Sequence, residues 1–342
     1  MSSNKCPQPL SSQDRQALSY AKKGIFLAAF SGLIFSADGI LIKTTGEYAP
    51  FSDPTLWLLV PLVCAGIHDL CAGVVVTFLN WRSGRMRELW RSLASKPGRY
   101  VIVGALTGAL MGMGGYMTAL QMAGPAYVLP ITTLYPAVAS VLAVFILKER
   151  IPVRAWIGLF FCIIGACAVG YTPPDGQAGD LFYLGLLFAA LAAVGWGTEG
   201  VLATSGMDFV EPVIALNIYY LVSALLYVVG IIPLVSLLVY SKQGGLLLPL
   251  SFVASKGSLF LLLAGVLGGI AYLCWYKSMN MTGVSRAMAL NISYALWGIM
   301  LSAIFTEVQI TATLVVGALV IFSGMFLVIG NPRDLLNLRK VD

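Results

Sequence analysis

Two carboxylates stand inside long apolar stretches of this sequence. Asp38 lies in the run 24–42 and Glu199 in the run 181–203, and each acid precedes a glycine and two aliphatic residues. A charged side chain at the centre of a bilayer costs about 3 kcal/mol on insertion scales, so such acids face a protein interior or a water-filled path. There a carboxylate can bind a cation or exchange a proton. The alternative is a protonated acid that is hydrogen-bonded to the backbone of a neighbouring helix.

Aromatic residues recur at helical spacing near these acids. Trp196 precedes Glu199 by three residues, so both side chains share one helix face. A second polar-aromatic stripe and two single tyrosines complete the set: Asn291, Tyr294, Trp297, Tyr116 and Tyr135. A carboxylate surrounded by Trp and Tyr suits a quaternary ammonium ion, because the rings add cation–π attraction. The alternative is that these rings pack between helices or lie at the membrane interface.

The only histidine, His68, is adjacent to Asp69 in the middle of the run 57–79. This pair is a candidate for proton coupling, together with Asp38 and Glu199; the alternative is a structural hydrogen bond. Cys64, His68 and Cys71 share a helix face, but one helix supplies only three ligands and no Cys/His cluster occurs elsewhere. We therefore expect neither a metal site nor a cofactor.

The composition places these residues in a membrane. Of the 342 residues, 58% are hydrophobic and 11% are charged, whereas soluble domains have about 25% charged residues. A span needs about 20 apolar residues, and the sequence predicts ten of them: 24–42, 57–79, 100–120, 126–147, 155–171, 181–203, 213–239, 258–276, 286–305 and 311–329. Gly104, Gly108 and Gly112, spaced by four, predict close helix packing within the third. The expected fold is all-α.

The basic residues predict the orientation. With both tails, 1–23 and 331–342, in the cytoplasm, 18 of the 21 Lys and Arg residues lie in cytoplasmic segments and three lie outside. The net charge of +6 is therefore a topology signal rather than a sign of nucleic-acid binding. The segment 172–180, rich in Pro, Gly and Asp, is the expected extracytoplasmic linker between five spans and five.

The two halves, 24–171 and 181–330, share a pattern. The segments 119–124 and 278–283 resemble each other, Glu149 and Glu307 each follow an apolar run, and glycine pairs seven residues apart come next: Gly158 with Gly165, and Gly317 with Gly324. Because each half has an odd number of spans, the second enters the membrane upside down. An inverted repeat is typical of secondary transporters, in which one half rocks against the other around a midplane site.

A family resemblance rests on the segments 134–138 (LYPAV), 145–150 (FILKER), 156–158 (WIG) and 164–165 (IG). They resemble the closing half of an EamA-type repeat, the unit of the drug/metabolite transporter superfamily. The segment 289–298 (ALNISYALWG) is similar to the choline-permease branch of that superfamily. The resemblance implies ten helices, a central cavity and alternating access, and it does not fix the substrate.

The sequence thus predicts a secondary transporter in a bacterial inner membrane, with a small organic cation such as choline as substrate. Glu199 and Asp38 would hold the cation, with Trp196, Tyr294 and Tyr135 around it. The alternatives are an exporter of amino acids or other metabolites, an intramembrane lipid-modifying enzyme that uses His68, Asp69 or Glu199, and a receptor without transport. No Walker loop, GxSxG or HExxH motif occurs. The energy would come from a gradient of substrate, protons or another ion.

Overall fold

Helices make up almost all of the chain. The computed structural model of the protein describes residues 12–123, 128, 131–170, 181–305 and 312–329, and no strand occurs within them. The first half contains α1 (Ser12–Thr45), α2 (Leu59–Arg82), α3 (Met86–Ala94), α4 (Lys96–Thr107), η2 (Gly108–Gly114), α5 (Gly115–Ala123), α7 (Tyr135–Ile146) and α8 (Val153–Gly170), with a short 3₁₀ turn, η1 (Pro54–Leu56), before α2. The second half contains α9 (Phe182–Gly206), α10 (Pro212–Ala224), η3 (Leu225–Ile231), α11 (Ile232–Leu238), α12 (Leu248–Val253), α13 (Gly257–Thr282), α14 (Val284–Asn291), α15 (Tyr294–Phe305) and α16 (Ala312–Ile329), with the short turns η4 (Ser241–Gln243) and η5 (Gly245–Leu247) before α12.

The helices are long and apolar enough for a bilayer. Six continuous segments within the described residues reach spanning length, and three shorter apolar helices accompany them. Large hydrophobic side chains point outward from several helices: Phe145, Val229, Leu259 and Phe326 are each more than two-thirds exposed. Such an apolar surface is unfavourable in water and favourable in lipid. This is therefore an all-α multi-pass membrane protein.

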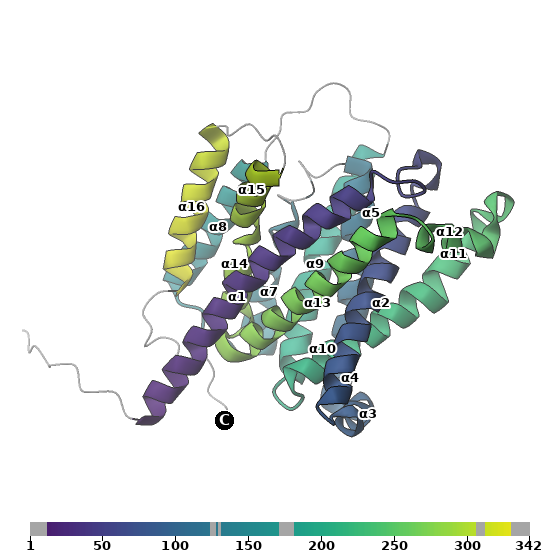
Figure 1. Cartoon of the computed structure of the whole chain (residues 1–342). Coiled ribbons are helices and arrows are strands. Elements are labelled where there is room, and N and C mark those ends of the chain that lie inside the picture. The colour runs from purple at the N-terminus through teal and green to yellow at the C-terminus, as the bar shows by residue number, and fades with distance from the viewer. Residues whose placement is uncertain (1–11, 124–127, 129–130, 171–180, 306–311, 330–342) are drawn as a thin grey trace, which may run out of the picture.

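The first helix is longer than the sequence suggested. We expected a span from residue 24, whereas α1 begins at Ser12. Residues 12–23 contain Gln, Arg, Ala, Leu and Lys, which favour helix, so the helix continues beyond its apolar part. The start of α1 and the end of α16 lie at the same end of the molecule as α3 (Figure 1). Of the segments named above, residues 1–11 of the first tail, the linker 172–180, Glu307 and the tail 331–342 lie outside the described residues.

Small residues set the closest helix contacts. A side chain at Gly158 would bring its Cβ within 2.6 Å of the Gly324 carbonyl oxygen, and one at Gly165 would come within 2.7 Å of that of Gly317. The two glycine pairs that the sequence aligned therefore face each other where α8 packs on α16 (Figure 1). Glycine permits such an approach because no Cβ separates the two backbones.

Two long helices change their winding in the middle. Residues of η2 and η3 form π-helices, which continue α4 and α10 respectively. The Tyr227 hydroxyl, in η3, donates a hydrogen bond of 2.6 Å to the Ala109 carbonyl oxygen, in η2. A π-helix loosens the regular hydrogen-bond ladder and is frequent at functional sites. Here the two π-helices contact each other inside the bundle.

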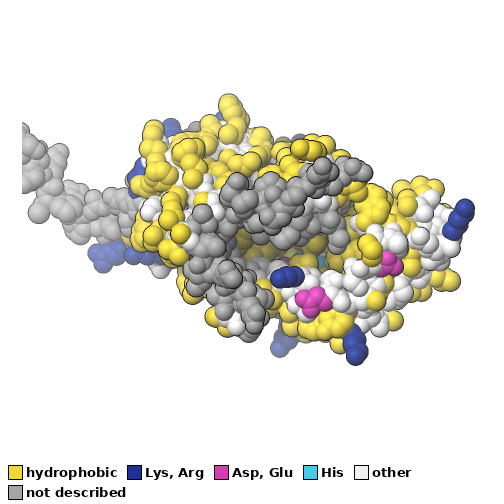
Figure 2. Space-filling view, turned by 90° about the horizontal axis from the view of Figure 1, so that it is seen from above, with side chains coloured by type: hydrophobic (Ala, Val, Ile, Leu, Met, Phe, Trp, Pro, Cys, Tyr) yellow, Lys and Arg dark blue, Asp and Glu magenta, His cyan; other side chains and the backbone are white. Residues whose placement is uncertain are grey.

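Charge is unevenly distributed between the two ends. The basic residues of α3 and of the turns beside it are exposed at one end: Arg82, Arg87, Arg91, Lys96 and Arg99. At the opposite end, viewed in Figure 2, hydrophobic side chains are widespread and charged ones are few. The positive-inside rule predicts that the end with α3 faces the cytoplasm.

Candidate functional site

The site begins at two interrupted helices. Turn residues Thr133 and Leu134 precede α7, and Ile292 together with Ser293 separates α14 from α15. The tyrosines that begin the next helices, Tyr135 and Tyr294, are 159 residues apart in the chain. A pair of interrupted helices at corresponding positions in two halves is typical of a transporter binding site.

Hydrogen bonds connect the two interruptions. The Tyr135 hydroxyl donates to Asn291 Oδ1 at 2.9 Å, and the Met288 carbonyl oxygen lies 3.3 Å from the same hydroxyl. Asn291 Nδ2 donates to Ser31 Oγ at 3.1 Å, and Ser31 donates to the Ala271 carbonyl oxygen at 2.8 Å. Side chains of α1, α7 and α14 are thereby joined in one buried polar chain.

Aromatic rings surround this chain. The Trp196 ring lies 5.3 Å from that of Tyr116 and 6.3 Å from that of Tyr135, centroid to centroid. Tyr294 is partly buried and packs against the same hydrophobic cluster as Tyr135 and Trp196. Four of the six polar-aromatic residues singled out in the sequence thus come together, and Asn291 is hydrogen-bonded to one of them. Trp297 is half-buried on α15, and its Nε1 has no hydrogen-bond partner among the described residues.

The sequence analysis did not identify one group of aromatic residues near this site. Trp275 is buried, and its ring lies 6.4 Å from that of Tyr135. It packs against the rings of Tyr272 and Tyr276, and two more buried tyrosines, Tyr219 and Tyr220, pack against Tyr272. The spacing of Tyr272, Trp275 and Tyr276 puts them on one face of α13, which is the signal that could have identified them. The Tyr219 and Tyr220 hydroxyls have no hydrogen-bond partner in the described chain.

Glu199 lies at the border of these rings. Its side chain is fully buried, and Oε1 accepts a hydrogen bond of 2.8 Å from the Tyr276 hydroxyl. The other oxygen, Oε2, has no hydrogen-bond partner among the described residues. An unpaired oxygen on a buried carboxylate is available to a cation or a donor that enters the site.

The glycine row of the third expected span makes room for this acid. A Cβ at Gly108 would collide with Glu199 Oε2, and a Cβ at Gly112 would come within 2.6 Å of Trp196 Cδ1. At Gly104 the Cβ would meet the Glu199 carbonyl oxygen at 3.2 Å. Close packing by this row is confirmed, and so is the common helix face of Trp196 and Glu199. The row does more than pack, since it also forms the wall against which the carboxylate lies.

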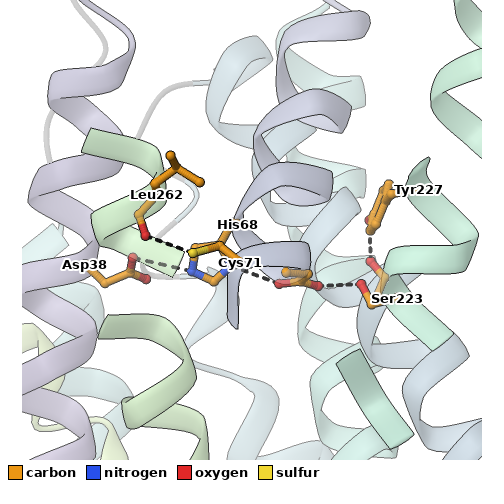
Figure 3. A network of polar contacts seen from close by, with 8 residues as sticks. Asp38, His68, Cys71, Ser223, Tyr227 and Leu262 are labelled. Carbon is orange, nitrogen blue, oxygen red and sulfur yellow. Dashed lines mark hydrogen bonds and ion pairs between the residues drawn. The ribbon is translucent and has the colours of Figure 1, made fainter. Parts of the chain in front are cut away.

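The second acid belongs to a separate polar group. Asp38 Oδ1 lies 3.4 Å from His68 Nε2, and His68 Nδ1 lies 2.9 Å from Asp69 Oδ1 (Figure 3). The Ser223 hydroxyl donates to Asp69 Oδ2 at 2.5 Å. His68 and Asp69 are fully inaccessible, and Asp38 is 3% exposed. The contact between Asp38 and His68 joins α1 to α2, and Ser223 brings in α10.

Two glycines of α13 leave the space that His68 occupies. A Cβ at Gly268 on α13 would collide with His68 Nε2, and one at Gly265 would come within 2.7 Å of the His68 carbonyl oxygen. The Cys71 sulfur contacts the Leu262 carbonyl oxygen at 3.2 Å (Figure 3). No group of three or more His, Cys, Asp and Glu side chains that could hold a metal ion is found in the part of the chain that the structure describes.

These features define a helical membrane protein whose polar and aromatic site lies between two interrupted helices. Two segments, 22–171 and 183–330, match the EamA-like transporter family, and the chain belongs to that family. The resemblance to this unit of the drug/metabolite transporter superfamily is confirmed. The family comprises transporters of small solutes across membranes, not enzymes.

Two individual comparisons agree with this assignment. Protein LicB of Haemophilus influenzae is 24% identical over 284 residues, which cover 81% of this chain and 87% of LicB. A protein solved by crystallography superposes with a TM-score of 0.66 at 18% identity, over 89% of this chain and 97% of that one. This likeness establishes the fold alone.

Proposed function

We propose that this protein is a secondary transporter of a small organic cation, such as choline, in a bacterial inner membrane. Its ten spans form an inverted repeat of five and five, with both termini in the cytoplasm. The observation that carries the proposal is the pair of interrupted helices joined by the Tyr135–Asn291 hydrogen bond. Tyr135 comes from the first half of the chain and Asn291 from the second, so movement of one half against the other would open the space between them.

The substrate charge follows from the side chains beside that space. Glu199 supplies the compensating carboxylate, and Trp196, one helical turn away, supplies a ring face. Tyr116, Tyr135 and Tyr294 extend the aromatic wall, and Asn291 and Trp297 add polar groups. A quaternary ammonium ion cannot donate hydrogen bonds, so recognition by rings and one carboxylate suits it.

The Asp38–His68–Asp69 group supports a coupling role for protons. Two unit charges about 4 Å apart interact by about 4 kcal/mol at an effective dielectric constant of about 20. Gain or loss of one proton within this group therefore changes the energy of its neighbours substantially. We assign Asp38, His68 and Asp69 to proton coupling and Glu199 to the substrate, with Asp38 as a second candidate ligand.

The first experiment is uptake of labelled choline into sealed proteoliposomes. Wild-type protein should show saturable uptake. Glu199→Gln should weaken binding by about 1–3 kcal/mol, the scale of a partly desolvated charge interaction. Glu47→Gln is the matched control, because Glu47 is exposed in the turn that follows α1. Uptake that is the same in both variants would contradict the assignment of Glu199.

The alternative transport function is export of amino acids or other metabolites. If folded wild-type protein takes up no choline, amino acids, amines and nucleosides should be screened for thermal stabilisation. A ligand that binds only the folded state raises the melting temperature. Covalent turnover of a lipid by the purified protein would instead favour an enzyme.

A further inference from the structure

Glu149 is buried at a contact between the two halves of the chain. Its side chain is only 4% exposed, although it follows α7 in a segment rich in basic residues. Oε1 accepts a hydrogen bond of 2.9 Å from the Val284 backbone N–H, and Oε2 accepts one of 2.9 Å from the Ser285 hydroxyl. Both donors belong to the first turn of α14. The carboxylate thus caps a helix of the second half from a loop of the first half, where a negative charge is favoured by the helix dipole.

The backbone on both sides is shaped for this contact. Lys148 has a φ of 53°, the left-handed conformation that non-glycine residues rarely adopt. It turns the chain so that the Glu149 N–H bonds back to the Ala143 carbonyl oxygen at 3.1 Å. Gly283 has a φ of 83°, and a Cβ there would come within 2.9 Å of Glu149 Oε1. Glycine is required at this position both for the conformation and for the approach of the carboxylate.

Two sets of hydrogen bonds therefore join α7 and the residue after it to α14, one near each end of α14. Tyr135, at the start of α7, bonds to Met288 and Asn291 near the end of α14, and Glu149, just after α7, bonds to the start of α14. The two sets of hydrogen bonds lie at the two ends of the 12-residue α7. Along α14 they run from Val284 to Asn291, a rise of about 10 Å at 1.5 Å per residue. All eight residues of α14 are buried. Glu149 stands between Lys148 and Arg150, in a segment that the positive-inside rule predicts to be cytoplasmic.

We propose that the Glu149 cap is a gate on the cytoplasmic side of the site. The contact holds α7 against α14 and closes the route from the cytoplasm to Tyr135 and Asn291, and it breaks when that side opens. Gly283 is the hinge about which α14 moves. This inference rests on the proposed alternating access, because two helices from different halves must separate on one side at a time.

The test is accessibility of α14 from the cytoplasm. The reporter is Ala287→Cys, at a fully buried position of α14, in a protein whose six cysteines are replaced by serine or alanine. A membrane-impermeant maleimide is applied to inside-out and to right-side-out sealed vesicles. With Glu149 intact the reporter should be protected from both sides. With Glu149→Ala, labelling from the cytoplasmic side should become at least tenfold faster and labelling from the outside should not change.

Further variants separate a gate from a general loss of packing. Glu149→Gln retains one acceptor oxygen without the charge and should fall between wild type and Glu149→Ala. Glu88→Ala, an exposed acid on α3, is the matched control and should change nothing. If Glu149→Ala does not fold, Ser285→Ala removes one of the two hydrogen bonds and should still raise cytoplasmic labelling. Unchanged labelling in the folded variants, or equal acceleration from both sides, would overturn the gate.

The labelling requires no substrate, so its result is independent of choline. A one-sided increase without choline uptake by the wild-type protein refutes the substrate and leaves the gate. Choline uptake that depends on Glu199, together with unchanged labelling, refutes the gate alone.

Discussion

Gly108 faces Glu199 where α4 gives way to η2, and a single methyl group at this position tests how the carboxylate is held. The Cβ of Gly108→Ala would collide with Glu199 Oε2 and would lie 2.5 Å from Cδ and 2.8 Å from Cγ. The carboxyl group must therefore turn away, and its hydrogen bond with Tyr276 is lost.

The magnitude follows from three terms. Alanine is favoured over glycine in a helix by about 1 kcal/mol. Overpacking of a tight contact costs about 1–3 kcal/mol, and an acceptor left unpaired in the interior costs about 1–3 kcal/mol. The net loss in the free energy of unfolding is about 1–5 kcal/mol. Gly39→Ala is the matched control, because a Cβ there has nothing within 4 Å. It should gain about 0.5–1 kcal/mol instead.

The assay is denaturant unfolding of the purified protein in detergent, with each glycine variant measured in two backgrounds. In Glu199→Ala protein the carboxylate is absent, and Gly108→Ala should lose most of its effect. The same loss in both backgrounds would refute the argument, because the methyl group would then be clashing with something else. Stabilisation of Gly108→Ala equal to that of Gly39→Ala would refute the contact itself.

Two further predictions concern transport. Trp196→Leu should weaken choline binding by about 0.5–2 kcal/mol, the range of a cation–π contact; calorimetric titration measures this, and an unaltered affinity would favour the metabolite-export alternative. An imposed pH gradient should accelerate choline uptake by wild-type proteoliposomes, and His68→Gln should abolish the acceleration because the imidazole between Asp38 and Asp69 is gone; a gradient without effect on the wild type would exclude proton coupling.

Local sequence patterns were sufficient to predict the fold class and the family of this protein. Runs of apolar residues predicted a helical membrane protein, and the motifs around Tyr135 and Gly158 predicted the family. The spacing of Trp196 and Glu199 predicted their common face, because helical geometry relates neighbours in the chain directly. The paired glycines of α8 and α16 were also visible, since small residues at regular intervals have few other uses in a membrane.

Contacts between segments that are distant in the chain could not be predicted from the sequence. Asp38 and Glu199 occupy matching places in the two halves, yet Asp38 lies against His68 and Glu199 is hydrogen-bonded to Tyr276. The sequence placed Glu149 in a basic loop, but the structure buries it against the first turn of α14. The partners of these acids could not be inferred from the sequence, because they depend on which helices become neighbours and on how each helix is rotated.

The sequence by itself determined that the chain forms long apolar helices, where the basic residues stand along it and which side chains are too polar to face lipid. These properties depend on the transfer of individual residues between water and hydrocarbon, and transfer energies are local. Only the tertiary structure decided which acid meets which partner and where the two π-helices touch. Those contacts join residues up to 260 positions apart, and they exist because small side chains such as Gly108 and Gly268 leave space for a carboxylate and an imidazole on other helices.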